Sequence, residues 1–76
     1  MTNTRNYLVV IERAQDGSYS AYVPDLAGCV AVGQKTPEAA KRLIREAIAA
    51  HIQGLIEDGL PVPDPSSRGE YVDAVA

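Results

Sequence analysis

Residues 7–23 have the hydrophobic and polar pattern of two paired β-strands. Residues 7–13 are rich in β-branched and aromatic side chains, and residues 18–23 alternate polar with apolar positions. Asp16 and Gly17 lie between these stretches and form a pair that can adopt the positive φ angles of a tight turn. The pattern therefore predicts a β-hairpin.

The first of these stretches is apolar on both of its faces. Leu8 and Val10 lie on one face, and three further apolar side chains alternate with them on the other. Such a strand is either central in its sheet or has its second face covered by another chain. A single helix covers only one face of a small sheet, so we expect Leu8, Val10 and Tyr22 to form an apolar patch through which the chain makes a homodimer or larger homo-oligomer. Unpaired sheet edges offer a second route to the same assembly.

The segment after the hairpin combines several residues that stop or turn a chain. Pro24 lacks a backbone donor and ends the strand pairing, Gly28 allows a turn, and residues 29–33 are apolar enough for a short third strand. Asp25 is expected to cap its own loop through an Asx turn. We interpret the segment as a corner of the fold rather than a catalytic loop, formed by Pro24, Asp25, Gly28, Cys29 and Thr36.

A long amphipathic helix follows this corner. Thr36 is suited to the N-cap, Pro37 to the first helical position, and Gly59 to the position just past the end. Between them apolar residues recur at steps of three and four, which indicates a broad apolar face on a helix roughly 33 Å long. Gly54 interrupts the helix at a cost of about 1 kcal/mol relative to alanine, so we expect close packing there.

The remaining chain divides into a connector and an alternating end. Residues 61–69 contain three prolines and two serines, which predicts an extended connector, and residues 70–76 alternate in the manner of a last strand. The order β-β-β-α-β predicts an α+β, two-layer fold, with an antiparallel-rich sheet and one long helix on one face. We expect residues 1–76 to form a single domain.

Composition restricts the class of protein. With one cysteine and one histidine in 76 residues, the chain offers no internal disulfide and no zinc-ligand spacing. A formal net charge of −3 argues against direct nucleic-acid binding, which requires a basic surface. No apolar stretch approaches the ~20 residues of a membrane helix, and the first residues lack a signal-peptide core. We therefore expect a cytoplasmic protein that does not bind a membrane.

Residues that could support catalysis have simpler structural explanations. Cys29 would need a nearby base, and His51 lies far along the helix, so we expect a small buried cysteine and a half-buried histidine. Carboxylates in turns could hold Mg²⁺ or act as acids and bases. Their spacing does not predict convergence, so we expect no catalytic site, no metal and no cofactor. The alternatives are a small metal-dependent nuclease or hydrolase using Asp16, Asp25 or Asp64, and a stand-alone oligomeric interaction module.

Taken in order, the motifs of residues 7–66 resemble those of the HicB-like antitoxin family. That family has an acidic-Gly turn before an aromatic, a Pro-acidic-Leu-x-Gly-Cys loop, a Thr-x-Glu-Ala helix start and a Pro-x-Pro after the helix. The matching pieces here are Asp16-Gly17 with Tyr19, PDLAGC at 24–29, Gly33, TPEAA at 36–40, and the prolines at 61–65.

The resemblance implies a fold, a partner and a role. It implies a partial RNase H-like domain, commonly oligomeric, that binds and neutralises a HicA-type toxin. Such toxins are basic proteins that cleave mRNA using a histidine, and an acidic antitoxin is suited to cover their active site. Many members also have a C-terminal DNA-binding domain. The sequence given ends at Ala76, directly after the predicted last strand, so we expect no such domain here. The acidic cluster of active RNase H enzymes is not recognisable in this sequence.

Overall fold

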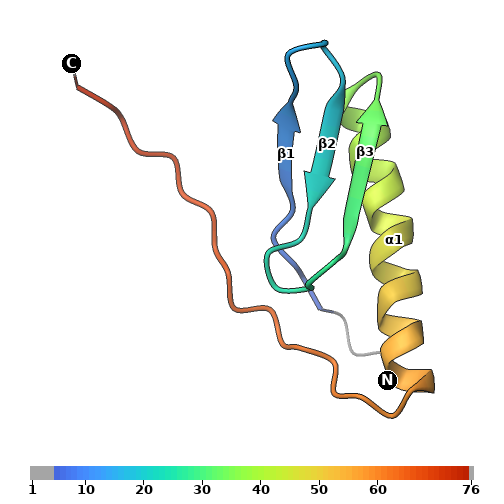
Figure 1. Ribbon diagram of the computed structural model, residues 1–76. Coiled ribbons are helices and arrows are strands. Elements are labelled where there is room, and N and C mark those ends of the chain that lie inside the picture. The colour runs from blue at the N-terminus through green and yellow to red at the C-terminus, as the bar shows by residue number, and fades with distance from the viewer. Residues whose placement is uncertain (1–4, 76) are drawn as a thin grey trace.

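The computed structural model describes residues 5–75, and it contains a three-stranded antiparallel sheet followed by one long helix. The elements in chain order are strands β1 (Val10–Arg13), β2 (Tyr19–Tyr22) and β3 (Val30–Gln34) and helix α1 (Pro37–Glu57). The strands lie side by side in the order β1-β2-β3, with α1 against one face (Figure 1). This arrangement confirms the predicted α+β class, with antiparallel strands and a single long helix.

The hairpin between β1 and β2 depends on the predicted turn residues. Gly17 has a φ of +86°. The Asp16 carboxylate accepts hydrogen bonds from the backbone N–H of Ser18 at 2.9 Å and from its hydroxyl at 2.6 Å. These bonds close an Asx turn, which fixes the register that pairs Val10 with Tyr22.

The third strand contains a β-bulge. Ala21 pairs with Ala31, whereas Tyr19 pairs with Gln34, so β3 has one residue more than β2 over this stretch. Gly33 lies in the extra length with a φ of +70°, a conformation that favours glycine. Gly33 therefore lies within the strand and does not end it, and the strand extends one residue further than the sequence predicted.

Helix α1 begins and ends where its capping residues predict. The Thr36 hydroxyl accepts a hydrogen bond from the backbone N–H of Ala39 at 3.0 Å. At the other end Gly59, with a φ of +68°, donates to the Ile56 carbonyl, and the N–H of Leu60 donates to the Leu55 carbonyl. This pair of bonds is a Schellman motif, which satisfies the last carbonyls of the helix.

The core between sheet and helix is built mostly from small side chains. Alanines on β2, β3 and α1 allow the helix to lie close to the sheet, and Leu26 and Ile44 are the largest of the fully buried side chains. The buried set is Ala21, Val23, Leu26, Cys29, Ala31, Ala40 and Ile44. Tyr7, Val9, Tyr19, Ala47 and Ile48 pack around it. The helix packs chiefly against β3 and β2 and least against β1.

The predicted last strand is not formed. Residues 70–75 have no strand pairing, and Figure 1 shows this end of the chain extended away from the sheet. The side chains of Tyr71, Val72 and Val75 are 107%, 85% and 96% exposed. The alternation of polar and apolar residues is therefore not enough to form a strand where no neighbouring strand pairs with it. The remaining residue of the predicted strand, Ala76, lies outside the described residues.

Gly54 is also not the close contact that its position suggested. A Cβ built on Gly54 would meet no atom within 4 Å, so no neighbouring element requires a glycine there.

Candidate functional site

The sheet face opposite α1 has no covering element among the described residues. Cross-strand pairing aligns Val10, Tyr22 and Val30 on this face, because Ala21 and Ala31 point the other way into the core. Tyr22, Val30 and Val32 are 39%, 56% and 66% exposed. We name Val10, Tyr22, Val30 and Val32 the open face.

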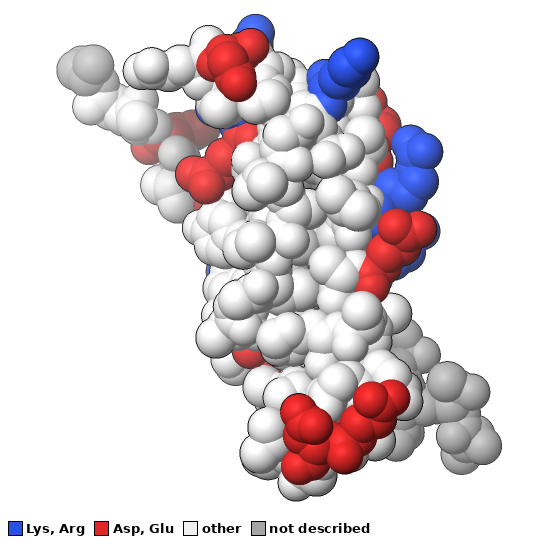
Figure 2. Space-filling view, turned by 45° about the vertical axis from the view of Figure 1, so that its right-hand side comes forward, with Lys and Arg blue, Asp and Glu red and all other residues white. Residues whose placement is uncertain are grey.

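The space-filling view shows the character of this side of the molecule. Figure 2 shows a broad uncharged surface with acidic side chains below it, at the end of α1, and others above and to the left of it, while Lys and Arg side chains interspersed with acidic ones line the right-hand margin. The sequence prediction named Val10 and Tyr22 but missed the two β3 valines. Their signal was present, because both alternate with the buried Ala31 in an apolar run.

Leu8 differs from the other predicted patch residues. It is half-buried, and a Cβ built on Gly69 would lie 3.2 Å from Leu8 Cδ1. The chain after α1 therefore passes over Leu8 and covers part of the predicted patch.

Asp25 anchors this passing chain rather than its own loop. Its Oδ2 accepts the backbone N–H groups of Ser66 and Ser67, both at 2.9 Å. Its Oδ1 accepts the two serine hydroxyls at 3.1 and 2.7 Å. The Ser67 backbone N–H contributes most to lowering the pKa of Asp25 from 3.8 to about 2, followed by the Ser67 hydroxyl and the Ser66 backbone N–H. The predicted Asx turn is thus replaced by a contact with residues 41 and 42 positions away.

Two further contacts hold the same stretch of chain. The Tyr7 hydroxyl donates a hydrogen bond to the Pro63 carbonyl. At the surface, Arg5 Nε lies 3.8 Å from Asp64 Oδ1. Residues 60–69 are therefore held against the chain that leads into β1 and against the loop after β2, and we name them the docked connector.

The structure places the other corner residues in one hydrogen-bonded loop between β2 and β3. The Cys29 N–H donates to the Leu26 carbonyl at 3.1 Å, and the Val23 N–H donates to the Cys29 carbonyl at 3.2 Å. Gly28 has a φ of +81° and Pro24 follows the last paired residues. Cys29 is 4% exposed, and burial raises the pKa of its thiol. Thr36 lies at the other end of β3, where it caps α1.

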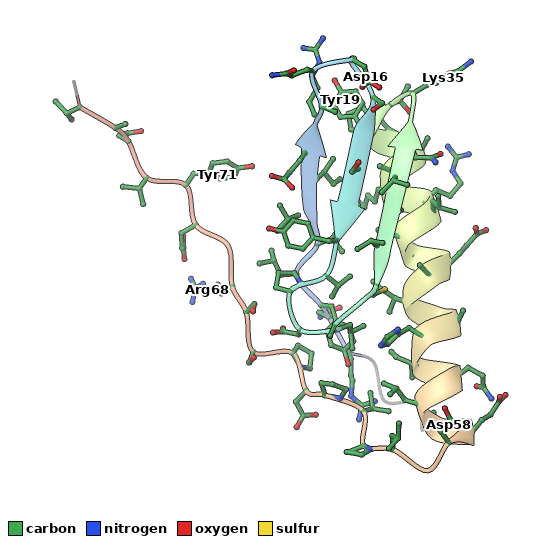
Figure 3. All side chains as sticks on the ribbon, in the orientation of Figure 1. Asp16, Tyr19, Lys35, Asp58, Arg68 and Tyr71 are labelled. Atoms are coloured by element: carbon green, nitrogen blue, oxygen red, sulfur yellow. The ribbon has the colours of Figure 1, made fainter. Side chains whose placement is uncertain are left out.

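The acidic residues considered for catalysis do not converge. Asp16 lies in the hairpin turn, at the opposite end of the molecule from Asp58, where α1 ends and the chain leads into the docked connector that contains Asp64 (Figure 3). All the Asp25 hydrogen bonds described above are made to the docked connector. Among residues 5–75 no group of three His, Cys, Asp or Glu side chains could hold a metal ion.

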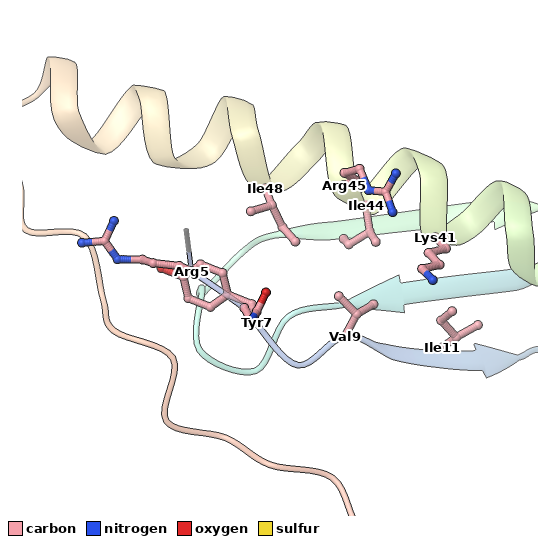
Figure 4. A pocket seen from close by; sticks show the side chains of 9 residues that line it. Arg5, Tyr7, Val9, Ile11, Lys41, Ile44, Arg45 and Ile48 are labelled. Carbon is pink, nitrogen blue, oxygen red and sulfur yellow. The ribbon is translucent and has the colours of Figure 1, made fainter. Parts of the chain in front are cut away.

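An open groove of about 560 Å³ runs between β1 and α1. Val9 and Ile11 of the first strand region face Ile44 and Ile48 of the helix across it (Figure 4). Three cationic side chains complete its wall, namely Arg5, Lys41 and Arg45. The groove exists because α1 packs over β2 and β3 and leaves the β1 side of the helix without a neighbour.

Within the described residues no helix is long and apolar enough to cross a membrane.

Known relatives share most of this chain. It is 43% identical to the UPF0150 protein ssr1765 of Synechocystis over 58 residues, covering 76% of this chain and 72% of that protein. It is 40% identical over 68 residues to the UPF0150 protein Ta0767 of Thermoplasma acidophilum, covering 90% of this chain and 97% of that protein. A 14.9 kDa protein in the rep-hol intergenic region of Haemophilus phage HP1 is 36% identical over 67 residues, which cover 88% of this chain and 49% of the phage protein.

The family comparison covers the hairpin, the corner, the helix and the connector together. Residues 7–75 match the family described as the HicB-like antitoxin of bacterial toxin-antitoxin systems. The matched range includes both the open face and the docked connector, so the likeness extends beyond any single motif. This chain therefore belongs to the HicB-like antitoxin family.

Proposed function

We propose that this protein is a cytoplasmic antitoxin that binds a basic, HicA-type mRNA-cleaving toxin and neutralises it by covering the toxin's active site. Membership of the antitoxin family over residues 7–75 is the observation that supports this most strongly. The net charge of −3 is consistent with it, since an acidic protein associates quickly with a basic one.

Binding rather than catalysis fits the chemistry of the described surface. The only cysteine is buried and burial raises its pKa, while the carboxylates of Asp16 and Asp25 are hydrogen-bonded in a turn and in the connector contact. A broad uncharged surface bordered by charges is a common form of protein interface.

The test uses a small, basic HicA-type toxin, sought first in the reading frame next to that of this protein. The two proteins are co-expressed and co-purified, and RNA cleavage by the toxin is measured with increasing amounts of the antitoxin. We expect a stoichiometric complex, loss of cleavage, and an association rate that falls as salt is added. Failure to form a complex and to inhibit cleavage would overturn the proposal.

A control addresses the nuclease alternative. The purified protein is incubated alone with RNA and Mg²⁺, beside Asp25→Asn. We expect no cleavage by either, whereas cleavage abolished by the substitution would identify an enzyme instead of an antitoxin.

We propose further that the protein is a homo-oligomer and that the open face is an interface between copies. Val10, Tyr22 and Val30 form a continuous apolar row across the three strands. Soluble proteins usually bury apolar surface of this kind in an interface. A chain of this size buries only about 60% of its unfolded surface, so covering this row with a second copy would add stability.

A further inference from the structure

Residues 70–75 form an extended segment of the described chain without a partner. The segment contains Tyr71, Val72 and Val75, each at least 85% exposed, in a sequence that alternates like a strand. Its six residues span ~20 Å when extended at ~3.3 Å per residue, which is long enough for a complete edge strand. Apolar side chains this exposed are costly in water and favour a partner.

The docked connector directs this segment away from its own sheet. Asp25 holds Ser66 and Ser67, and Gly69 passes over Leu8. Beyond that point the chain runs clear of β1 instead of along it (Figure 1). The anchors therefore fix where the free segment starts while leaving its own backbone groups unpaired.

The sheet has an edge that fits such a segment. Among residues 5–75, β1 pairs only with β2, and the groove between β1 and α1 lies beside the free edge of β1. A strand added there would place alternate side chains over Ile11, Ile44 and Ile48. The other edge is less suited, because β3 is bulged at Gly33 and bulges hinder pairing.

Charge favours the same pairing. The segment contains Glu70 and Asp73, and the groove wall contains Lys41 and Arg45. Glu70 already forms an ion pair with Arg68 at 2.9 Å. Asp73, Lys41 and Arg45 form no ion pair with any residue that the structure describes.

We propose that residues 70–75 of one copy add as a β-strand to the free β1 edge of a second copy, over the groove between β1 and α1. Two copies exchange their segments reciprocally, because each offers both a segment and an edge. The exchange supplies the missing fourth strand to each sheet. It pairs the free backbone groups of the β1 edge in both copies and covers the groove between β1 and α1. This contact is at the sheet edge and is separate from the open face, and it does not depend on toxin binding.

The first experiment removes the backbone donor from the segment. Val72→Pro is compared with Val72→Thr, which remains β-branched, and molar mass is measured by sedimentation equilibrium at micromolar concentration. We expect the mass of the wild-type assembly to fall by at least half in Val72→Pro and to be unchanged in Val72→Thr. Because Val72 is 85% exposed, both variants should fold, which circular dichroism checks.

The second experiment tests the receiving edge by charge reversal. Lys41→Glu and Asp73→Lys are each expected to weaken self-association several-fold, and the double variant to restore most of the loss. Lys35→Glu, another exposed lysine outside the groove, is the matched control and should have no effect.

Three results would overturn the proposal. One is a wild-type protein that is monomeric at every concentration measured. This holds both where hydrogen exchange finds residues 70–75 unprotected and where it finds them protected by pairing with their own sheet. Another is an assembly indifferent to Val72→Pro. The third is an assembly that responds to open-face substitutions but not to the charge reversals. None of these would affect the toxin proposal, which is tested by inhibition of RNA cleavage.

Discussion

Cys29 shows how a reactive residue type can serve as a small core residue. It is 4% exposed beneath the loop between β2 and β3, and burial raises the pKa of its thiol, so the reactive thiolate is disfavoured. The half-buried His51 lies on the helix well away from the corner in sequence, and nothing in the described chain lowers the thiol pKa in compensation.

Replacing Cys29 with serine should therefore reduce stability without changing partner binding. The hydroxyl would be buried where no hydrogen-bond partner is provided, at a cost of about 1 to 3 kcal/mol. Urea denaturation measures the free energy of unfolding, and partner affinity is measured on folded protein. Rapid labelling of native Cys29 by a thiol reagent would contradict this.

Asp25 supports a pH-dependent prediction about the docked connector. The pKa of Asp25 in the folded protein is about 2, below the ordinary value of 3.8. The ionised carboxylate therefore contributes its full share to the stability of the connector contact above pH 3.8, and this stabilisation is lost as the pH falls toward 2. The amide resonances of Ser66 and Ser67, followed by NMR, should shift together with a midpoint near 2.

The matched variant for this titration is Asp25→Asn, which retains the shape of the side chain but not its charge. It should weaken the serine contacts at neutral pH and abolish the low-pH midpoint. An unchanged titration in Asp25→Asn would mean that another group controls the connector.

At the scale of elements, the helix follows its local signals except at Gly54. Thr36, Pro37 and Gly59 define its ends, and each acts through its own backbone geometry. Gly54 has open space around a hypothetical Cβ, so it is an unneeded glycine in a helix interior.

Gly54→Ala should consequently stabilise the protein by about 1 kcal/mol, since alanine has the higher helix propensity. Gly59→Ala is the contrasting variant, because its φ of +68° disfavours any Cβ, and it should destabilise by roughly 1–2 kcal/mol. Both are measured by the urea midpoint at constant m value. If Gly54→Ala destabilises the protein instead, Gly54 must be in close contact with another molecule, because nothing in the described part of its own chain lies within 4 Å of a Cβ at this position.

At the scale of the whole molecule, the sheet has one face covered by α1 and another exposed to solvent. Among residues 5–75, three of the seven buried core residues are alanines, so the core buries little apolar surface for a chain of this length. The exposed face and the free edges are then the places where further burial can occur.

Open-face self-association can be tested with residues of matched exposure. Val30→Glu and Val10→Glu should weaken the oligomer at least tenfold, because a charge would be buried in the interface. Ile56→Glu is the control, since Ile56 is 58% exposed on α1 and Val30 is 56% exposed on the sheet. Equal effects at Val30 and Ile56 would place the interface elsewhere.

The sequence by itself determined the three strands, the helix and their order. Turns at Asp16 and Gly17, the cap at Thr36 and the end at Gly59 depend on residues only a few positions apart, so local chemistry specifies them. Alternation also separates the two faces of the sheet, and it places Val10 and Tyr22 on the same face, in agreement with their cross-strand pairing.

Only the tertiary structure decided what lies beside each element. The contact of Asp25 with Ser66 and Ser67 joins residues 41 and 42 positions apart, which no local pattern encodes. The same holds for Leu8, whose exposure depends on the connector crossing it. Residues 70–75 have the alternation of a strand, but a strand forms only where a second backbone supplies hydrogen bonds, and among residues 5–75 no segment does so.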